Sequence, residues 1–171
     1  MNFQVQRERM VDQQIVRRGV RNRHVLDAMR KIPREQFVSD ELREFAYEDS
    51  PLPIAAGQTI SQPYIVALMM DAAEISPSDR VLEVGAGSGY AAAVAGAVAA
   101  RVYAIERHAE LTALAKGRLQ RLGYANVEVR TGDGTAGWPE AAPFDVILAA
   151  AGGPSVPEVL LKQLAAGGRL V

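Results

Sequence analysis

The sequence predicts an α/β fold, a doubly wound and mainly parallel sheet with helices on both faces, preceded by a helical N-terminal extension. Three observations support this prediction. Strand-like apolar runs alternate with helix-like stretches from Arg80 onward, a tight glycine turn joins the first of these strands to an Ala-rich helix, and acidic residues recur where strands end. Repeated βα units favour parallel strands, and such sheets bind ligands at the carboxyl ends of their strands.

The bulk properties of the chain restrict the classes of protein it can belong to. Its 171 residues suit one domain with a sizeable core. We divide this domain into a helical, substrate-side region over 1–78 and a βα core over 79–171. The net charge of −1 gives no footprint for nucleic acid or an anionic membrane. With no cysteine and only two distant histidines, His24 and His108, we expect no disulfide and no metal site.

Location and assembly follow from what the sequence lacks. The longest strongly apolar run, over 90–100, is too short and too rich in alanine to span a bilayer. The N-terminus carries charges where a signal peptide has an apolar stretch. Since the cysteine-free chain also suits a reducing compartment, we expect a cytoplasmic protein with no membrane partner. No heptad pattern is present, so a monomer is the default expectation.

Two helices are predicted near the N-terminus. Apolar residues spaced along 3–18 predict an amphipathic helix that ends near Gly19. Asn22 is a suitable N-cap for a second helix, which Pro33 terminates. Residues 34–57 contain two prolines and a glycine and predict irregular, turn-rich structure.

A polar segment over 57–64, Gly-Gln-Thr-Ile-Ser-Gln-Pro-Tyr, precedes an apolar helical stretch over 65–73. Ser61 is a natural N-cap for that helix, because Pro63 is tolerated in a first turn. Thr59 suits an ordinary turn. From spacing alone, a capping role for Ser61 is at least as well supported as a functional one.

The central motif lies at Val81–Tyr90, Val-Leu-Glu-Val-Gly-Ala-Gly-Ser-Gly-Tyr. It predicts a buried strand, a glycine turn that lets the backbone approach a ligand, and a helix start with free N–H donors. Tyr90 occupies the sixth position of the dinucleotide pattern G-x-G-x-x-G, so that pattern fails. With Glu83 in the preceding strand, the spacing resembles motif I of class I S-adenosylmethionine methyltransferases. A glycine turn without a ligand is the alternative.

The rest of the chain continues the alternation. We expect strands over 101–106, 126–131 and 144–150, helices over 109–122 and 157–164, and a turn at Gly167-Gly168 into a fifth strand.

Carboxylates at the strand ends suggest how a nucleoside cofactor is held. Glu106 ends the second strand, where two oxygens can accept both ribose hydroxyl protons, although a solvated acid also suits that place. Asp133 lies between two glycines and suits either an adenine amino group or an ordinary turn. Glu83 can meet the cofactor's amino end or the turn amides. Asp145 is either structural or near the site, and Trp138 and the histidines suit packing or surface positions.

Several segments together resemble the protein-L-isoaspartate (D-aspartate) O-methyltransferase family. The most specific is the segment over 57–64, which general class I methyltransferases do not share. It is joined by Arg30–Val38, the glycine motif, Tyr103–Glu106, Gly132-Asp133-Gly134 with Trp138, Ala142–Asp145, and Gln163-Leu164 through Val171. The resemblance covers nearly the whole chain, in order and in spacing.

The resemblance implies an enzyme that repairs damaged proteins and peptides. It would transfer a methyl group from S-adenosylmethionine to the free α-carboxylate of L-isoaspartyl or D-aspartyl residues, leaving S-adenosylhomocysteine. The ester closes to a succinimide, which hydrolyses partly to aspartate. By position the resemblance assigns Ser61 to catalysis, Thr59, Ile60 and Ser61 to the substrate, and Glu83, Gly85, Gly87, Glu106, Asp133 and Gly134 to the cofactor.

Alternatives and one departure from the family pattern accompany this interpretation. A class I methyltransferase for another acceptor, a cofactor-binding domain without turnover, and a distant nicotinamide dehydrogenase are the other candidates. The family continues with further strands beyond the position of Val171. We therefore expect a sheet and core that are incomplete at the C-terminal side.

Overall fold

The computed structural model describes residues 2–153 and 155–171. The helices are α1 (Phe3–Met10), α2 (Arg23–Lys31), α3 (Pro63–Ala72), α4 (Tyr90–Val98), α5 (Ala109–Arg121) and α6 (Glu158–Leu161). The strands are β1 (Leu52–Pro53), β2 (Thr59–Ile60), β3 (Arg80–Val84), β4 (Arg101–Glu106), β5 (Val127–Thr131), β6 (Phe144–Ala149) and β7 (Leu164–Leu170).

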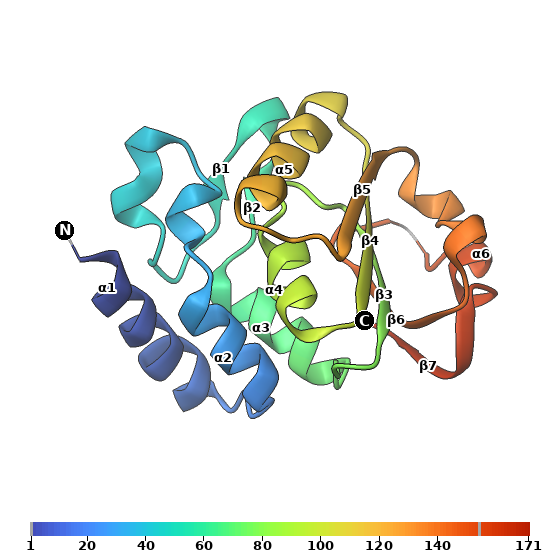
Figure 1. Ribbon diagram of the computed structural model, residues 1–171, viewed down its shortest axis with the longest axis horizontal. Coiled ribbons are helices and arrows are strands. Elements are labelled where there is room, and N and C mark those ends of the chain that lie inside the picture. The colour runs from blue at the N-terminus through green and yellow to red at the C-terminus, as the bar shows by residue number, and fades with distance from the viewer. Residues whose placement is uncertain (1, 154) are drawn as a thin grey trace.

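A five-stranded parallel sheet forms the centre of the molecule, in the order β5-β4-β3-β6-β7 (Figure 1). The central strand β3 pairs with β4 on one side and β6 on the other, so that Val81 lies opposite both Val102 and Val146. The chain winds outward from β3 in both directions, which opens a crevice at its carboxyl end. The predicted doubly wound α/β fold is confirmed.

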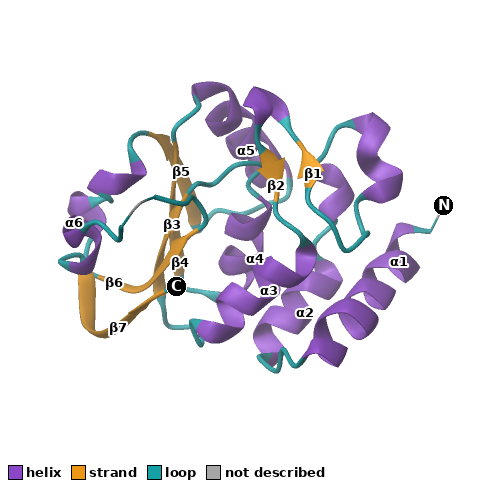
Figure 2. Cartoon of the chain, turned by 180° about the vertical axis from the view of Figure 1, so that it is seen from behind, coloured by secondary structure: helices purple, strands orange, loops and turns teal. Residues whose placement is uncertain are grey.

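Successive residues of each strand face opposite sides of the sheet. Val81, Val102 and Val146 belong to a core that includes residues of α2, α3 and α4. Their neighbours Leu82 and Ile147 pack on the other side with Trp138 and Leu160. Helices α3 and α4 therefore lie on one face and α6 lies on the other (Figure 2). This alternation is the period of two that strands impose on a sequence.

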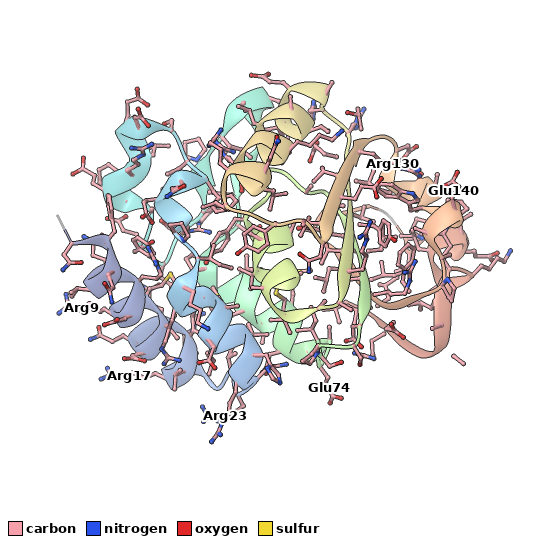
Figure 3. The ribbon with its side chains drawn as sticks, viewed as in Figure 1. Arg9, Arg17, Arg23, Glu74, Arg130 and Glu140 are labelled. Atoms are coloured by element: carbon pink, nitrogen blue, oxygen red, sulfur yellow. The ribbon has the colours of Figure 1, made fainter. Side chains whose placement is uncertain are left out.

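The N-terminal helices begin and end close to the predicted positions. Helix α1 continues through a π-helical turn, Val11–Ile15, and a 3₁₀ turn, Val16–Arg18, to Gly19 at φ 99°. Asn22 caps α2, because its side chain accepts the amides of His24 and Val25 at 3.1 and 3.4 Å. Figure 3 shows Arg9, Arg17 and Arg23 of this region pointing away from the sheet.

The C-terminal elements differ from the prediction. Helix α6 spans only Glu158–Leu161 instead of 157–164, and β7 begins at Leu164. Gly167 and Gly168 lie inside β7, at a register shift against β6, rather than in a turn before it. Gln163 explains the early helix end: its buried side chain accepts the Trp138 amide at 2.8 Å and donates to the Ala136 carbonyl at 2.9 Å. The glycines accommodate the bulge because Gly167 adopts φ 76°.

The opposite end of the sheet settles the role of Asp145. Its Oδ2 accepts the Arg80 amide at 2.8 Å, where strands β3 and β6 begin. Asp145 is therefore structural and lies away from the carboxyl ends of the strands. Over residues 2–153 and 155–171, no helix has the length and apolarity needed to cross a membrane.

Candidate active site

A cleft of about 1390 Å³ lies over the carboxyl ends of β3 and β4. The polar segment ahead of α3 lines it on one side, and the glycine turn and the loops after β4, β5 and β6 line the rest. All nine residues that the sequence singled out line this one cleft: Thr59, Ile60, Ser61, Glu83, Gly85, Gly87, Glu106, Asp133 and Gly134. They come from segments up to 75 positions apart, so the fold has brought them together.

The glycine turn is held against the neighbouring strand. The amides of Gly85 and Ala86 both donate to the Ile105 carbonyl, at 2.8 and 3.0 Å. Gly85, Gly87 and Gly89 all adopt positive φ, which residues with a Cβ atom rarely tolerate. A Cβ on Gly89 would lie 3.0 Å from that of Ala115 in α5, so this glycine also permits helix packing. A Cβ on Gly87 would approach only Ile54, at 3.7 Å.

Glu106 links the glycine turn to the start of α5. Its Oε2 accepts the Gly87 amide at 2.8 Å, and its Oε1 accepts the His108 amide at 2.9 Å, just before α5 begins. The residue is only 5% exposed. Each carboxylate oxygen has two lone pairs, so the group can hold these amides and still accept two hydroxyl donors from the cleft. The ribose role predicted from sequence fits this geometry, and a merely solvated acid does not.

Glu83 is a buried carboxyl that lines the cleft. Its Oε2 has no hydrogen-bond partner among the described residues. Burial, reinforced by the negative charge of Glu106, raises the pKa of Glu83 to about 8. A cationic group in the cleft would reverse this shift by stabilising the carboxylate. The orphaned oxygen therefore fits the amino end of S-adenosylmethionine.

Asp133 caps a short 3₁₀ turn, Gly134–Ala136, after β5. Its Oδ1 accepts the backbone amide of Thr135 at 2.9 Å and the Thr135 hydroxyl at 2.8 Å. These two bonds lower the pKa of Asp133, so the exposed side chain is ionised and can accept from a ligand. Gly134 packs on β3 so closely that a Cβ there would collide with the Val84 side chain. Asp133 can therefore cap this 3₁₀ turn and accept a hydrogen bond from a ligand at the same time.

The acceptor strip, residues Thr59–Ser61, is named for the role that the family resemblance implies. It consists of β2, which pairs with β1 in a small antiparallel hairpin, and of Ser61, which follows β2. Ser61 is not the helix cap that its spacing suggested. Gln62 is the N-cap residue of α3 and Pro63 is its first residue, with no side-chain cap. The geometric reason is that α3 begins one position too late for the Ser61 hydroxyl to cap it. Ser61 is half-buried and lines the cleft, and its hydroxyl makes no hydrogen bond to the described residues.

Several residues that line the cleft were missed in the sequence. They include Tyr90, which begins α4, His108 and Thr135, and the last residue of β6 with the loop that follows it, 149–153. The rule that ligands bind at the carboxyl ends of parallel strands also applies to β6 and could have found this loop. Trp138, by contrast, packs edge-on against Tyr103 and beneath Arg130, as predicted for a packing residue.

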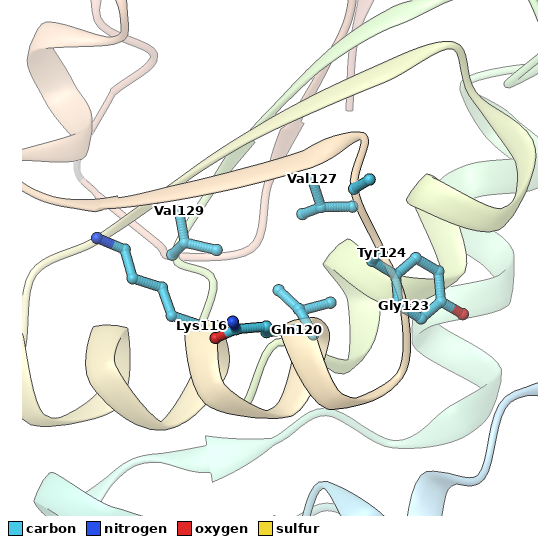
Figure 4. Close-up of a pocket in the computed structure, with 8 residues that line it drawn as sticks. Lys116, Gln120, Gly123, Tyr124, Val127 and Val129 are labelled. Carbon is cyan, nitrogen blue, oxygen red and sulfur yellow. The ribbon is translucent and has the colours of Figure 1, made fainter.

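A second, smaller groove of about 410 Å³ lies between α5 and the edge strand β5 (Figure 4). Lys116 and Gln120 of α5 face Val127 and Val129 of β5 across it. None of the nine predicted residues lines this groove, so it is not the candidate site. In the described part of the chain, no three His, Asp or Glu side chains cluster closely enough to hold a metal ion.

Comparison with known families gives one consistent result. Residues 5–171 match the family model described as protein-L-isoaspartate(D-aspartate) O-methyltransferase (PCMT). The chain is 59% identical over 170 residues to protein-L-isoaspartate O-methyltransferase 2 of Pelobacter propionicus, covering 99% of this chain and 76% of that protein. This chain thus spans about three quarters of that relative.

Solved structures agree with the family model. A protein-L-isoaspartate O-methyltransferase superposes with a TM-score of 0.88 at 36% identity, over 96% of this chain and 54% of that longer chain. A SAM-dependent methyltransferase from Thiobacillus denitrificans, in complex with S-adenosyl-L-homocysteine, superposes with a TM-score of 0.54 at 28% identity, over 64% of this chain and 47% of that one. The first of these structures covers nearly the whole of this chain, and the second covers about two thirds of it.

Proposed function

Because this chain belongs to the protein-L-isoaspartate(D-aspartate) O-methyltransferase family, we propose that it methylates the free α-carboxylate of isoaspartyl and D-aspartyl residues in damaged proteins and peptides. S-Adenosylmethionine is the methyl donor. The ester then closes to a succinimide, and hydrolysis returns part of it to aspartate. We assign binding of the damaged residue to the region over 1–78 and binding of the cofactor to the core over 79–171.

One observation carries the proposal: Ser61 lines the same cleft as the glycine turn and Glu106. The family resemblance that favoured isoaspartate rested most on the segment over 57–64. The structure brings that segment to the carboxyl end of β3, although about 20 residues and the whole of α3 separate the two in sequence. A general methyltransferase core needs the turn and the acid but has no requirement for this acceptor strip.

The residues of the cleft suit methyl transfer to a carboxylate. When bound, S-adenosylmethionine supplies an electrophilic methyl group on a positively charged sulfur. The acceptor carboxylate, with an ordinary pKa near ~3.3–4.3, is already ionised at neutral pH, so the protein need not remove a proton. Ser61 donates a hydrogen bond that orients the carboxylate, and the cleft walls exclude water. Glu83 meets the cofactor's ammonium and Glu106 its ribose.

The proposal is tested with labelled S-adenosylmethionine and two peptides that differ only in carrying isoaspartate or aspartate. We expect base-labile label on the isoaspartyl peptide alone, since a methyl ester is hydrolysed by mild base. Label on both peptides would contradict the specificity, and bound cofactor without label on either would contradict the activity. Ser78→Ala changes an exposed serine at the far end of the sheet and is the matched control for Ser61→Ala. It should label the isoaspartyl peptide as the wild type does.

A further inference from the structure

Arg34 is a fully buried arginine that connects the acceptor strip to the glycine turn. Its Nη2 donates to the Ser61 carbonyl at 2.9 Å, and its Nε donates to the Ala46 carbonyl at 2.7 Å. Its guanidinium lies 4.7 Å from the centre of the Tyr90 ring. Tyr90 is the first residue of α4, immediately after the third glycine, and it lines the cleft. Arg34 thus touches both halves of the site without lining the cleft itself.

The buried charge has no ionic partner. Among residues 2–153 and 155–171, no carboxylate lies within salt-bridge distance of Arg34, and its Nη1 has no hydrogen-bond partner. The neighbouring Glu35 is held instead by Arg7 and the Tyr47 hydroxyl. Burying a guanidinium against two carbonyls and a ring is costly compared with an apolar side chain of the same size. Core packing alone therefore does not explain an arginine here.

Ser61 has few other restraints on its backbone. It lies between β2 and α3, outside regular structure. Within the described residues, its carbonyl accepts from Arg34 and from no other donor, and its hydroxyl makes no hydrogen bond. The planar guanidinium is well suited to such a place, because its fixed fork can hold two carbonyls while its face stacks on an aromatic ring.

We propose that Arg34 is a positioning residue, which fixes the acceptor strip relative to the glycine turn so that the acceptor carboxylate meets the methyl group in line. The inference rests on the proposed function for the identity of the acceptor. It does not make Arg34 a contact of either ligand. Because the cofactor half of the cleft is held by its own contacts, loss of Arg34 should affect turnover far more than cofactor affinity.

The test compares Arg34→Met, which keeps an unbranched apolar stem but removes the guanidinium, with Arg34→Lys and with Arg43→Met as a matched control. Arg43 lies in the same region but pairs with Asp40 at the surface. For Arg34→Met we expect kcat on the isoaspartyl peptide to fall on the order of tenfold or more, because a displacement of a reacting group by about 1 Å is costly in rate. The cofactor Kd should stay within about threefold, and Arg43→Met should match the wild type.

Arg34→Lys keeps the charge and so guards against a variant that does not fold. A single ammonium cannot hold both carbonyls and the ring, so this variant should fold and still lose several-fold in kcat. Full kcat in either folded variant would overturn the proposal. An equal loss of kcat and cofactor affinity would also overturn it, since that pattern indicates general support of the core.

A second measurement does not depend on the identity of the acceptor. Amide hydrogen exchange over residues 59–62, with cofactor bound, should be roughly tenfold faster in Arg34→Met than in Arg43→Met. Unchanged exchange would overturn the positioning role. If the wild type failed to methylate the isoaspartyl peptide while exchange still changed as expected, the proposed function would fail and the role of Arg34 in holding the strip would stand.

Discussion

The cofactor half and the acceptor half of the cleft are held by different kinds of contact. In the cofactor half, amides of the glycine turn donate hydrogen bonds to the Ile105 carbonyl and the Glu106 carboxylate, both at the end of β4, the strand next to β3. These contacts follow from the register of adjacent parallel strands. In the acceptor half, Ser61 is held by Arg34, which arrives from a different part of the chain, 27 residues away.

This difference has a mechanical consequence. The cofactor half is part of the hydrogen-bonded sheet, so its geometry is stabilised with the whole core. The acceptor half depends on a two-stranded hairpin and a few long-range contacts, and two-stranded pairs are only marginally stable alone. We therefore expect substitutions in the two halves to give separable effects on cofactor binding and on turnover. The substitutions below test that separation.

The largest effect is expected at Glu106. Glu106→Ala should weaken S-adenosylmethionine binding on the order of 100-fold, because it removes charged acceptors for the ribose and releases the Gly87 amide. Glu106→Gln should also bind weakly, because the amide nitrogen would face an N–H donor of either Gly87 or His108. Isothermal calorimetry measures both affinities. Glu110→Ala, at an exposed position four residues later, is the control, and wild-type affinity in Glu106→Ala would remove the ribose assignment.

Ser61→Ala is expected to have a smaller and more selective effect. Turnover of the isoaspartyl peptide should fall roughly tenfold, through loss of one hydrogen bond that orients the acceptor, while cofactor affinity stays the same. Initial rates across peptide concentrations, together with calorimetry, measure the two quantities. Parallel losses in both would show that the two halves are not separable and that Ser61 is chiefly structural.

The smallest effect concerns Glu83 and its dependence on pH. With a pKa of about 8 in the folded chain and ~4.3 when unfolded, Glu83 keeps its proton in the folded state across that range. The stability that this protonation contributes is present at low pH and is lost as pH rises through about 8. The Tm of Glu83→Gln minus that of the wild type should therefore be a few degrees larger at about pH 8.5 than at about pH 5.

The control for that prediction is Glu128→Gln, which removes an exposed carboxylate on β5 that does not line the cleft. Saturating S-adenosylmethionine sharpens the comparison further. If its ammonium meets Glu83, the carboxylate is stabilised and the pH dependence of the Tm difference shrinks. A flat Tm difference without cofactor would show that the Glu83 carboxyl is not destabilised by burial.

The nine predicted site residues line one cleft, but they were predicted in two ways. The six at strand ends and in the glycine turns follow from short-range rules, whereas Thr59, Ile60 and Ser61 were assigned to the site by the family resemblance. Strands 101–106 and 80–84, the glycine turn and the acids at the strand ends could all be located by apolar runs and glycine spacing. The roles of these residues stay proposals that the substitutions above test. The Ser61 cap was wrong because a one-residue shift in the start of α3 depends on how Gln62 and Pro63 enter the helix, which spacing does not encode.

The elements near the C-terminus show the same limit. Gly167 and Gly168 suggested a turn because glycine permits one, yet the same freedom permits a bulge within β7. Pairing with β6 decided between the turn and the bulge, together with Gln163. The Gln163 side chain hydrogen-bonds to the backbone of Ala136 and Trp138, about 25 residues earlier in the chain. Neither contact produces a pattern in the neighbouring residues from which it could be predicted.

The sequence by itself determined the strand–helix alternation, the glycine turn and the acids that lie beside it, because the periods of strands and helices and the geometry of glycine are local properties. Only the tertiary structure decided that Ser61 lines the cleft instead of capping α3, that Asp145 is structural, and that Arg34 joins the two halves. Those outcomes depend on which distant groups compete for each donor and acceptor once the core is packed, and that competition exists only in three dimensions.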